Sequence, residues 1–559
     1  MSIAFLLVGL LLQQPDTSPA ETPGTLLQPM AVVAVPQPGE TYRRWAANPL
    51  IQRVIEKEML LELAEIGEEG SSLGAPAFFA MWDLFFQPLA GDVALFVDSL
   101  AGDGLHLMLL QDVLVDGVPR PPRFAAIAQG HDGEIAMDCL GPALQMTGVE
   151  RSTFRGEEWV VELPGLHLMR QGDRFLLAQD ADLLRQLASI PTASWLPSPD
   201  SEAFATFGQA DAHAWLSGDL LRSDGFPDLP EDAGASYLAG EVHEILRTTP
   251  WIGMRFGLQG SHLRTQFAMP APSDLRETHA PFLPAVEQIP IPRLERRMME
   301  AVFTRDLAHW WASRSEYMSE RGLTETIEGD SNLALLFGRD AGSEVFVHLE
   351  NQIRLIAAPL PAEEAAGLSV EYPAGAVGLR FREDAPEDLG QAFKNAFFAA
   401  ITFANFDGGS MNQGGLELDI LPVEGGRLYA ATYPSLEEGQ KAPTRYNFSP
   451  ALLVRDDGEL WISSSLGLLH EIAAAPTDWI EANGMWTHFE FPEMAALAQR
   501  DRALLVANQM LEEGGDLERA EIVIDLMLRF LGTLDRSTLH GFLDQEDLYR
   551  LDFSLHFRD

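Results

Sequence analysis

Two segments of this chain, 285 residues apart, share one pattern of apolar residues, and this pattern constrains the fold more than any other feature. In each, an alternating stretch (Arg174–Gln179, then Glu459–Ser464) runs into an apolar helical stretch. Leu183, Leu184, Ala188 and Pro191 recur as Leu468, Leu469, Ala473 and Pro476. Such a switch in period predicts a strand followed by a helix. We interpret the repeat as an internal duplication; a chance likeness between strand–helix modules is the alternative.

The ends and the starts of the two halves also look alike. Trp251–Met269 and Ser537–Phe557 each read as two alternating strands about a turn. In this comparison Leu258 and Leu263 match Leu543 and Leu548. At the starts, Met30–Val35 then Tyr42–Trp45, and Met299–Phe303 then Leu307–Trp311, each predict a strand followed by a helix.

A proline-rich stretch separates the halves. Prolines stand at positions 270, 272, 281, 284, 290 and 292. Proline lacks a backbone donor and opposes regular structure, so we expect residues 271–294 to form a linker. The predicted units are then residues 26–270 and 295–559, a division that fits a chain of 559 residues.

Each half mixes strands with helices. The predicted strands are Val93–Val97, Leu105–Leu110, Phe124–Gln129, Glu158–Leu163, Leu333–Gly338, Val345–Leu349, Ala376–Phe381, Leu416–Leu421 and Leu428–Tyr433. The predicted helices include one from Asn48 with a stripe from Ile51 to Ile66, and two, Leu389–Phe403 and Glu521–Leu531, apolar enough to be buried on most sides. Short turns between strands favour antiparallel sheet. We therefore predict an α+β fold of two tandem similar units, each a mainly antiparallel sheet with helices on one face.

The amino terminus is typical of a secretory signal peptide. Ile3–Leu12 is an apolar run about half as long as a membrane-spanning helix, and polar sequence with Ser18 and Ala20 follows it. We predict a signal peptide over residues 1–20; an uncleaved anchor and a misassigned start are the alternatives. No later segment has the length of apolar sequence that a spanning helix needs. The protein is therefore expected to be exported, to the periplasm or the cell surface, with no stable membrane span after cleavage.

Charge and cysteine content exclude some classes of protein. The 83 Asp and Glu against 38 Lys and Arg give a formal charge of −45, which repels phosphate backbones, so no nucleic acid is expected as a partner. The single cysteine, Cys139, permits no intramolecular disulfide, and its apolar neighbours indicate a buried side chain.

No catalytic motif in the sequence indicates an active site. Gly70–Gly74 matches the pattern around a nucleophilic serine, but Ser72 would follow a helix instead of a strand, so a loop is the better interpretation. The 13 histidines lack zinc-site spacing, and no phosphate-binding glycine loop follows a strand. No cofactor and no catalytic residue are predicted.

One stretch could hold calcium. Asp407, Asn412, Glu417 and Asp419 lie close in the sequence, and the last two would share a strand face. Calcium prefers such oxygen ligands. The spacing matches no EF-hand, and a hairpin loop is the alternative.

The succession from Val93 to Met269, with the opening at Met30–Trp45 and the module at Phe175–Leu187, resembles a family of large exported bacterial proteins of unknown function. The resemblance rests on pattern, without a diagnostic motif, and implies neither an activity nor catalytic residues.

These observations favour an exported, acidic, non-enzymatic binding or structural protein of the bacterial cell envelope, with an envelope protein or an apolar ligand as partner. A hydrolase whose active site comes from distant loops is an alternative, and it would need a pocket with converging carboxylates, histidines or a serine. A carrier of an apolar ligand is another.

Overall fold

The computed structural model describes residues 26–48, 93–113, 122–136, 152–189, 210–222, 251–271 and 287–558, with short gaps inside these ranges, and a few residues between 234 and 250. The predicted signal peptide, the helix after Asn48, Ser72 and Cys139 lie outside the described residues. In the described part, no helix is both long enough and apolar enough to span a membrane.

The first half contributes ten strands to a large sheet. They are β1 (Leu26–Val35), β2 (Gly104–Val113), β3 (Arg123–Gln129), β4 (Ser152–Phe154), β5 (Glu158–Leu163), β6 (Leu166–Gln171), β7 (Arg174–Ala178), β8 (Ala212–Ser217), β9 (Trp251–Gln259) and β10 (His262–Pro270). The helices in the described part of this half are α2 (Pro38–Ala46), α6 (Val93–Ala101), α8 (Ala181–Ser189) and α9 (Gly218–Leu221).

The second half contributes ten more strands. They are β12 (Met299–Phe303), β13 (Ile353–Ala358), β14 (Ala374–Arg380), β15 (Glu417–Val423), β16 (Gly426–Thr432), β17 (Ala451–Arg455), β18 (Glu459–Ser463), β20 (Gly484–Glu490), β21 (Leu534–Leu543) and β22 (Leu548–Phe557). Its helices are α12 (Leu307–Tyr317), α13 (Glu320–Phe337), α14 (Ala341–Glu344), η3 (Phe346–His348), α15 (Ala362–Ala365), α16 (Leu389–Ser410), η4 (Thr444–Asn447), α17 (Leu466–Ala474), α18 (Phe491–Arg500), α19 (Arg502–Glu513) and α20 (Leu517–Thr533).

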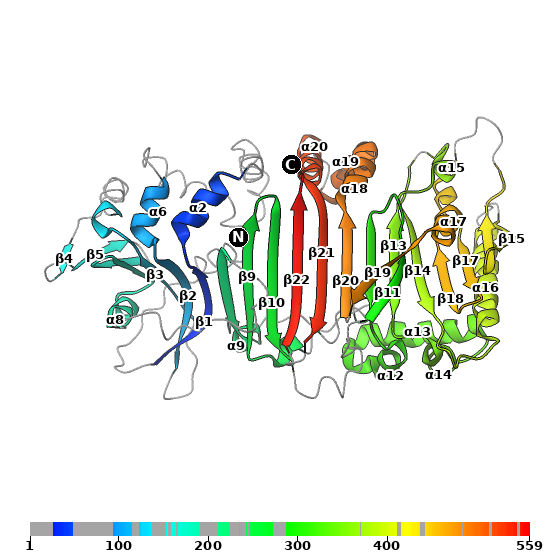
Figure 1. Ribbon diagram of the computed structural model, residues 1–559, viewed down its shortest axis with the longest axis horizontal. Helices are drawn as coiled ribbons and strands as arrows, with labels where there is room; N and C mark the ends of the chain where they lie inside the picture. Colours follow the sequence, from blue (N-terminus) through cyan, green and yellow to red (C-terminus); the bar gives the residue numbers. More distant parts are fainter. Residues whose placement is uncertain are drawn as a thin grey trace.

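All twenty strands form one antiparallel sheet that runs the length of the molecule (Figure 1). The pairings give the order β4–β5–β6–β7–β3–β2–β1–β8–β9–β10–β22–β21–β20–β12–β13–β14–β18–β17–β16–β15. The last strands of the two halves, β10 and β22, pair at its centre. The α+β class is therefore confirmed, and the halves meet through backbone hydrogen bonds.

The strand order is the same in both halves when it is counted outward from the β10–β22 pair. In the first half the order is β10, β9, β8, β1, β2, β3, β7, β6, β5, β4. In the second half it is β22, β21, β20, β12, β13, β14, β18, β17, β16, β15, and each strand corresponds to the one at the same place in the first order. This shared order is what a duplication would produce; the duplication itself stays a prediction. The register also changes one proposed match, because Leu258 pairs with Leu263 but Leu543 pairs with Tyr549, not with Leu548.

Helices cover both faces of the sheet, so the expectation of helices on one face is wrong. In the first half Leu176 packs in the core that includes the leucines of α8, whereas its neighbour Phe175, on the opposite face, packs with Ala101 of α6. In the second half Trp461 packs in the core with α17, and Leu460 packs with α16. Strands buried on both sides need a covering layer on each.

Three predicted strands are helical. Val93–Val97 begins α6, Leu333–Gly338 covers the end of α13, and Val345–Leu349 contains η3. Short apolar runs do not distinguish a buried helix from a strand by periodicity, which accounts for these errors. The two helices predicted to be buried on most sides expose part of their apolar surface, since Phe403 of α16 is 52% exposed and Phe530 of α20 is 46% exposed.

The expected linker contains a strand. Residues Glu287–Pro292 form β11, which pairs with β19 (Thr477–Ala482) in a separate two-stranded sheet. Ile289 and Ile291 enter the same core as Trp461 and are almost fully buried. Pro290 and Pro292 are tolerated because β11 has β19 as its only partner in the described part of the chain, and prolines suit such an edge.

Candidate functional site

A cavity of about 580 Å³ lies in the second half, beside the amino terminus of α17. The described residues that line it are Pro361, Glu363, Glu364, Ala366, Leu368, Thr432, Tyr433, Ser435, Ala442, Tyr446, Phe448, Ser449, Leu466, Gly467 and His470. They come from α15, from the segment after β16, from η4 and from α17. A concave site with aromatic rings and a few polar groups is the usual form of a small-molecule site.

One wall is fixed by the carboxylate of Glu364. Its Oε1 accepts hydrogen bonds from the hydroxyl of Ser449 (2.9 Å) and the backbone N–H of Gly467 (2.7 Å). Its Oε2 accepts from the hydroxyl of Ser465 (2.5 Å). Because Gly467 belongs to the first turn of α17, the negative charge lies at the positive end of the helix, where it is stabilised. Glu364 is therefore held in one position.

The start of α17 is capped at the same place. The Ser465 hydroxyl accepts from the backbone N–H of Leu468 (3.0 Å), and the Ser449 hydroxyl accepts from that of Leu466 (2.9 Å). A side chain at Gly467 would collide with Pro361, 2.7 Å from the position of an added Cβ. Glycine is thus needed at this position for α15 to approach the helix.

The opposite wall is aromatic. The rings of Tyr433 and Tyr446 have centroids 5.0 Å apart, and the Tyr446 hydroxyl donates to the carbonyl of Pro434 (3.0 Å). The guanidinium of Arg445 lies over both tyrosine rings, but Arg445 is not among the described residues that line the cavity. Phe448 adds a third ring, which is 47% exposed.

The buried side chain of Asn447 holds η4 in place. Its amide donates to the carbonyls of Val370 (3.0 Å) and Thr444 (2.9 Å), and its oxygen accepts from the backbone N–H of Tyr372 (2.8 Å). Such a fully used amide stabilises the segment that carries Tyr446.

The charge of the lining is negative. Two carboxylates and one histidine are present, and the described lining contains no lysine or arginine. Glu363 is exposed beside the fixed Glu364. Together with the −45 charge of the chain, this arrangement favours a cation over an anion in the cavity.

A serine hydrolase would need a serine hydrogen-bonded to a histidine. Here the Ser449 hydroxyl donates to Glu364, and His470 lies exposed on α17. The cavity thus brings together the residue types that the hydrolase alternative requires, but not in a nucleophile–base pair. An apolar carrier gains no support either, because Phe448 is the single phenylalanine among the described lining residues.

The calcium candidates are separated between two elements. Asp407 lies near the end of α16, whereas Glu417 and Asp419 are exposed on the edge strand β15. Asp419 accepts a hydrogen bond from the backbone N–H of Ile420 (2.8 Å), and Asn412 lies outside the described residues. Within the described ranges, no three His, Cys, Asp or Glu side chains gather as metal ligands would. The calcium site stays a prediction without support from these positions.

Sequence reasoning missed the cavity. Its lining comes from four segments between positions 361 and 470, and each contributes only three to five residues. The one local signal was the serine before the apolar helix at Leu466, which is typical of a helix cap.

Comparisons with known proteins do not identify a relative. No family model matches the chain, and no curated protein matches it. Crystal form IV of TP0453 superposes with a TM-score of 0.24 at 7% identity, over 44% of this chain and 77% of that chain. Form III gives 0.22 at 6% identity, over 46% and 85%. Likeness at this level supports no shared fold, so nothing known of TP0453 is transferred. The resemblance to a family of exported bacterial proteins remains an expectation.

Proposed function

We propose that this chain is an exported, non-catalytic binding protein of the bacterial cell envelope, and that the cavity beside α17 holds a ligand with a cationic group. The observation that carries the proposal is the pairing of a fixed carboxylate, Glu364, with an aromatic wall, Tyr433 and Tyr446, in a lining whose described residues include no lysine or arginine. Export and envelope location rest on the leader sequence of residues 1–20.

The ligand class follows from the lining. Carboxylates attract ammonium and guanidinium groups, and the faces of tyrosine rings attract cations as well. A volume of about 580 Å³ accommodates a small organic molecule or one basic side chain. An amine or guanidinium on a compact body is the chemistry that both walls recognise.

The test is titration calorimetry of the full-length mature protein with putrescine, arginine and tetramethylammonium, and with neutral glycerol as the uncharged comparison. We expect the cations to bind and glycerol not to bind. Glu363→Gln should weaken binding about tenfold, which corresponds to about 1.4 kcal/mol for one charged contact. The control Glu328→Gln removes an exposed carboxylate from α13 and should leave binding unchanged.

Two results would overturn the proposal. One is the absence of cation binding in protein that gives a cooperative melting transition. The other is binding that Glu363→Gln and Glu328→Gln weaken equally, because that would reflect the overall charge alone. Turnover of esterase, glycosidase or peptidase substrates that Glu363→Gln abolishes would favour the hydrolase instead.

A further inference from the structure

A row of polar side chains crosses the centre of the sheet on one face. Directly paired residues of neighbouring strands share a face, so the register places Arg255, Gln266, Asp552 and His540 side by side on β9, β10, β22 and β21. The row extends to His213 on β8, which pairs with Arg255. The two halves of the chain meet within this row, at the pair Gln266 and Asp552.

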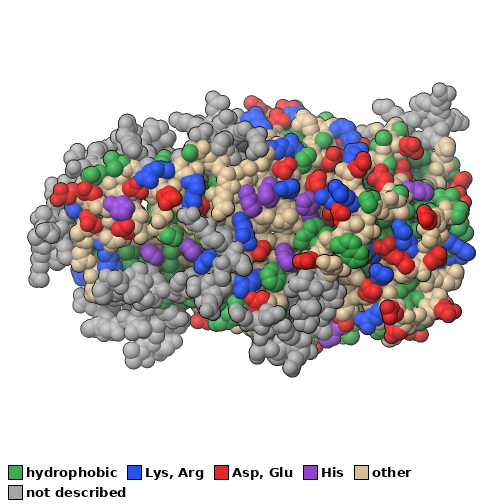
Figure 2. Space-filling model, in the orientation of Figure 1, with side chains coloured by type: hydrophobic (Ala, Val, Ile, Leu, Met, Phe, Trp, Pro, Cys, Tyr) green, Lys and Arg blue, Asp and Glu red, His purple; other side chains and the backbone are tan. Residues whose placement is uncertain are grey.

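Two further rows on the same face are polar as well. Residues two positions along each strand lie on that face again. The second row holds Arg264, Ser554, Thr538 and His488, and the third holds His262, His556, Arg536 and Glu490. We call these three rows, with His213, the central polar face. Figure 2 shows His and Lys or Arg side chains gathered over the central strands.

This face is rich in basic residues, whereas the chain as a whole is acidic. It carries three arginines and five histidines against two carboxylates, in a protein with more than twice as many acidic as basic residues. One of the carboxylates, Asp552, lies 3.7 Å from Arg264, and the other, Glu490, is 2.8 Å from Arg297. Both negative charges are thus matched by arginines already.

Several polar atoms of the first row are buried without a hydrogen-bond partner among the described residues. Both amide atoms of Gln266 are in this state, and the side chain is only 1% exposed. So are Oδ1 of Asp552, Nε2 of His540 and, in the third row, Nε2 of His262. By contrast, Thr538 and Ser554 bond to each other at 2.7 Å. Each unsatisfied buried group costs about 1–3 kcal/mol, so these groups favour a hydrogen-bonding partner beyond the described residues.

The pKa values of four histidines on this face are lowered, and a negative charge bound nearby would raise them. Burial lowers the pKa of His540, against the raising effect of Asp552, and burial and then Arg255 lower that of His213. The pKa of His262 is lowered by burial and by His556, Arg264 and Arg536, and that of His556 by burial and by Arg536, while Asp535 raises it. The rings of His262 and His556 stack with centroids 4.1 Å apart. The two arginines beside the stacked imidazoles give a region of positive potential, and a bound anion would raise the pKa of both histidines.

We propose that the central polar face binds a small ligand through an oxyanion, a carboxylate or a phosphate group, held by Arg264, Arg536 and the stacked His262 and His556. A small ligand is favoured over an anionic polymer because the −45 charge repels extended polyanions. The ligand contacts both halves of the chain, since β10 and β22 both contribute. The proposal does not depend on the cavity beside α17.

The test is titration calorimetry of the full-length mature protein with inorganic phosphate and with succinate, at pH 6 and at pH 8. We expect both probes to bind, and succinate to bind more tightly at pH 6 than at pH 8, because the bound anion raises the pKa of the two histidines and favours their protonation. Phosphate should show a smaller change, because phosphate itself loses negative charge between pH 8 and pH 6. Binding of phosphate alone or of succinate alone assigns the group, and binding of both supports a general oxyanion site. Failure of both probes to bind at pH 6 would overturn the proposal.

Variants separate a binding role from a structural one. Arg536→Gln with His262→Gln should weaken binding at least about tenfold. Arg185→Gln, on the exposed surface of α8, should leave it unchanged. Gln266 lies four residues from His262 along β10, about 13 Å away, so Gln266→Leu should leave binding unchanged, and the melting temperature should stay the same or rise because leucine removes the unpartnered amide. If Gln266→Leu weakened binding as much as the Arg536 and His262 substitutions do, the loss would be a structural effect and would contradict the proposed contacts.

Discussion

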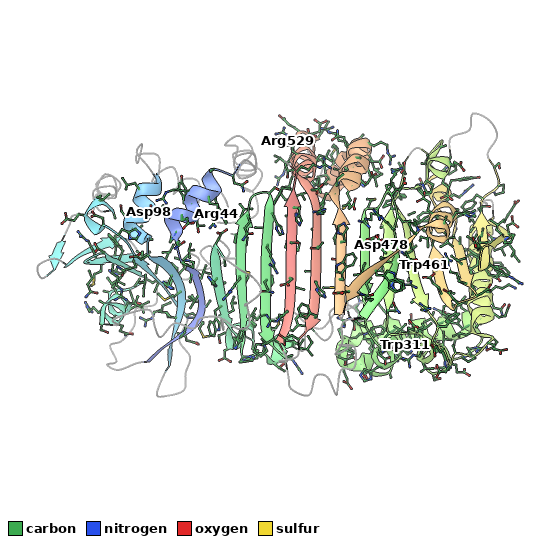
Figure 3. All side chains as sticks on the ribbon, viewed as in Figure 1. Arg44, Asp98, Trp311, Trp461, Asp478 and Arg529 are labelled. Atoms are coloured by element: carbon green, nitrogen blue, oxygen red, sulfur yellow. The ribbon has the colours of Figure 1, made fainter. Side chains whose placement is uncertain are left out.

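The guanidinium of Arg354 lies over the indole ring of Trp461, with its Cζ 4.8 Å from the ring centroid, in the interior of the second half (Figure 3 labels Trp461). Arg354 is 1% exposed and donates to the carbonyls of Leu379 (3.0 Å) and Pro290 (3.2 Å) and to the carboxylate of Glu459 (2.5 Å). Burial lowers the pKa of Arg354, and Glu459 opposes that shift. A single buried charge thus connects β13, β14, β18 and β11.

Replacing this arginine should destabilise the protein strongly. Arg354→Ala opens a void over Trp461 and removes one of the two arginines that pair with Glu459, which keeps Arg455 at 3.1 Å, so we expect the free energy of unfolding to fall by about 2–5 kcal/mol. Urea denaturation followed by tryptophan fluorescence measures this change. Arg185→Ala, which removes an exposed ion pair with Asp182, should cost less than about 0.5 kcal/mol. Similar costs for both variants would mean that Arg354 is not a structural centre.

Gly378 makes room for the same indole. A Cβ added there would lie 2.6–2.8 Å from three carbons of the Trp461 ring. Gly378→Ala should therefore lower the free energy of unfolding by about 1–3 kcal/mol. Trp461→Leu introduces the residue found at the matching position Leu176 and should remove most of the cost of Gly378→Ala in the double variant. Additive costs in this cycle would exclude the steric explanation.

The cap of α17 supports both stability and the cavity. Ser465→Ala removes the acceptor for the N–H of Leu468 and a donor to Glu364, and should cost about 1–2 kcal/mol. The comparison is Ser319→Ala, which removes the cap of α13 at Gly322 without a carboxylate partner. Both should destabilise the protein in urea denaturation. Only Ser465→Ala should also weaken cation binding, and an equal effect of both on binding would argue against the role of Glu364.

Stability should fall as the solution becomes acidic through pH 6.5. Burial lowers the pKa of His106, His213 and His540 below the usual 6.5. The unfolded chain then takes up protons near pH 6.5 that the folded chain does not bind, so stability is complete above that pH and is lost toward the folded-state pKa. Urea denaturation between pH 7.5 and 5.5 should show this decrease, and the triple variant with glutamine at all three positions should show a shallower one. If the stability of both proteins decreased equally between pH 7.5 and 5.5, these three histidines would not be the cause.

Much of the local structure could be predicted. The strands at Glu158–Leu163 and Met299–Phe303 have the bounds expected of them, and the module from Arg174 recurs from Glu459 as a strand and a helix. Such periods depend on residues that are neighbours in the sequence. The errors fall on short apolar runs such as Val93–Val97, and on the proline-rich stretch, where Ile289 and Ile291 form a strand because a core was available to bury them.

The candidate sites could not be predicted in the same way. Glu364 meets Ser449, Ser465 and Gly467 only after four segments have packed together. Gln266 lies in an ordinary alternating strand, and its burial beside Asp552 follows from pairing with a strand nearly 300 residues away in the sequence. Neither arrangement has a local spacing that a motif could express.

The sequence by itself determined the α+β class and most strand–helix modules, because alternation of apolar and polar residues selects an element and its buried face within a few positions. Only the tertiary structure decided that the two halves join in one sheet through β10 and β22, that helices cover both faces, and that the central polar face lies at the join. The physical reason is that strand register depends on contacts between distant segments, and a shift of one residue would turn every side chain to the other face.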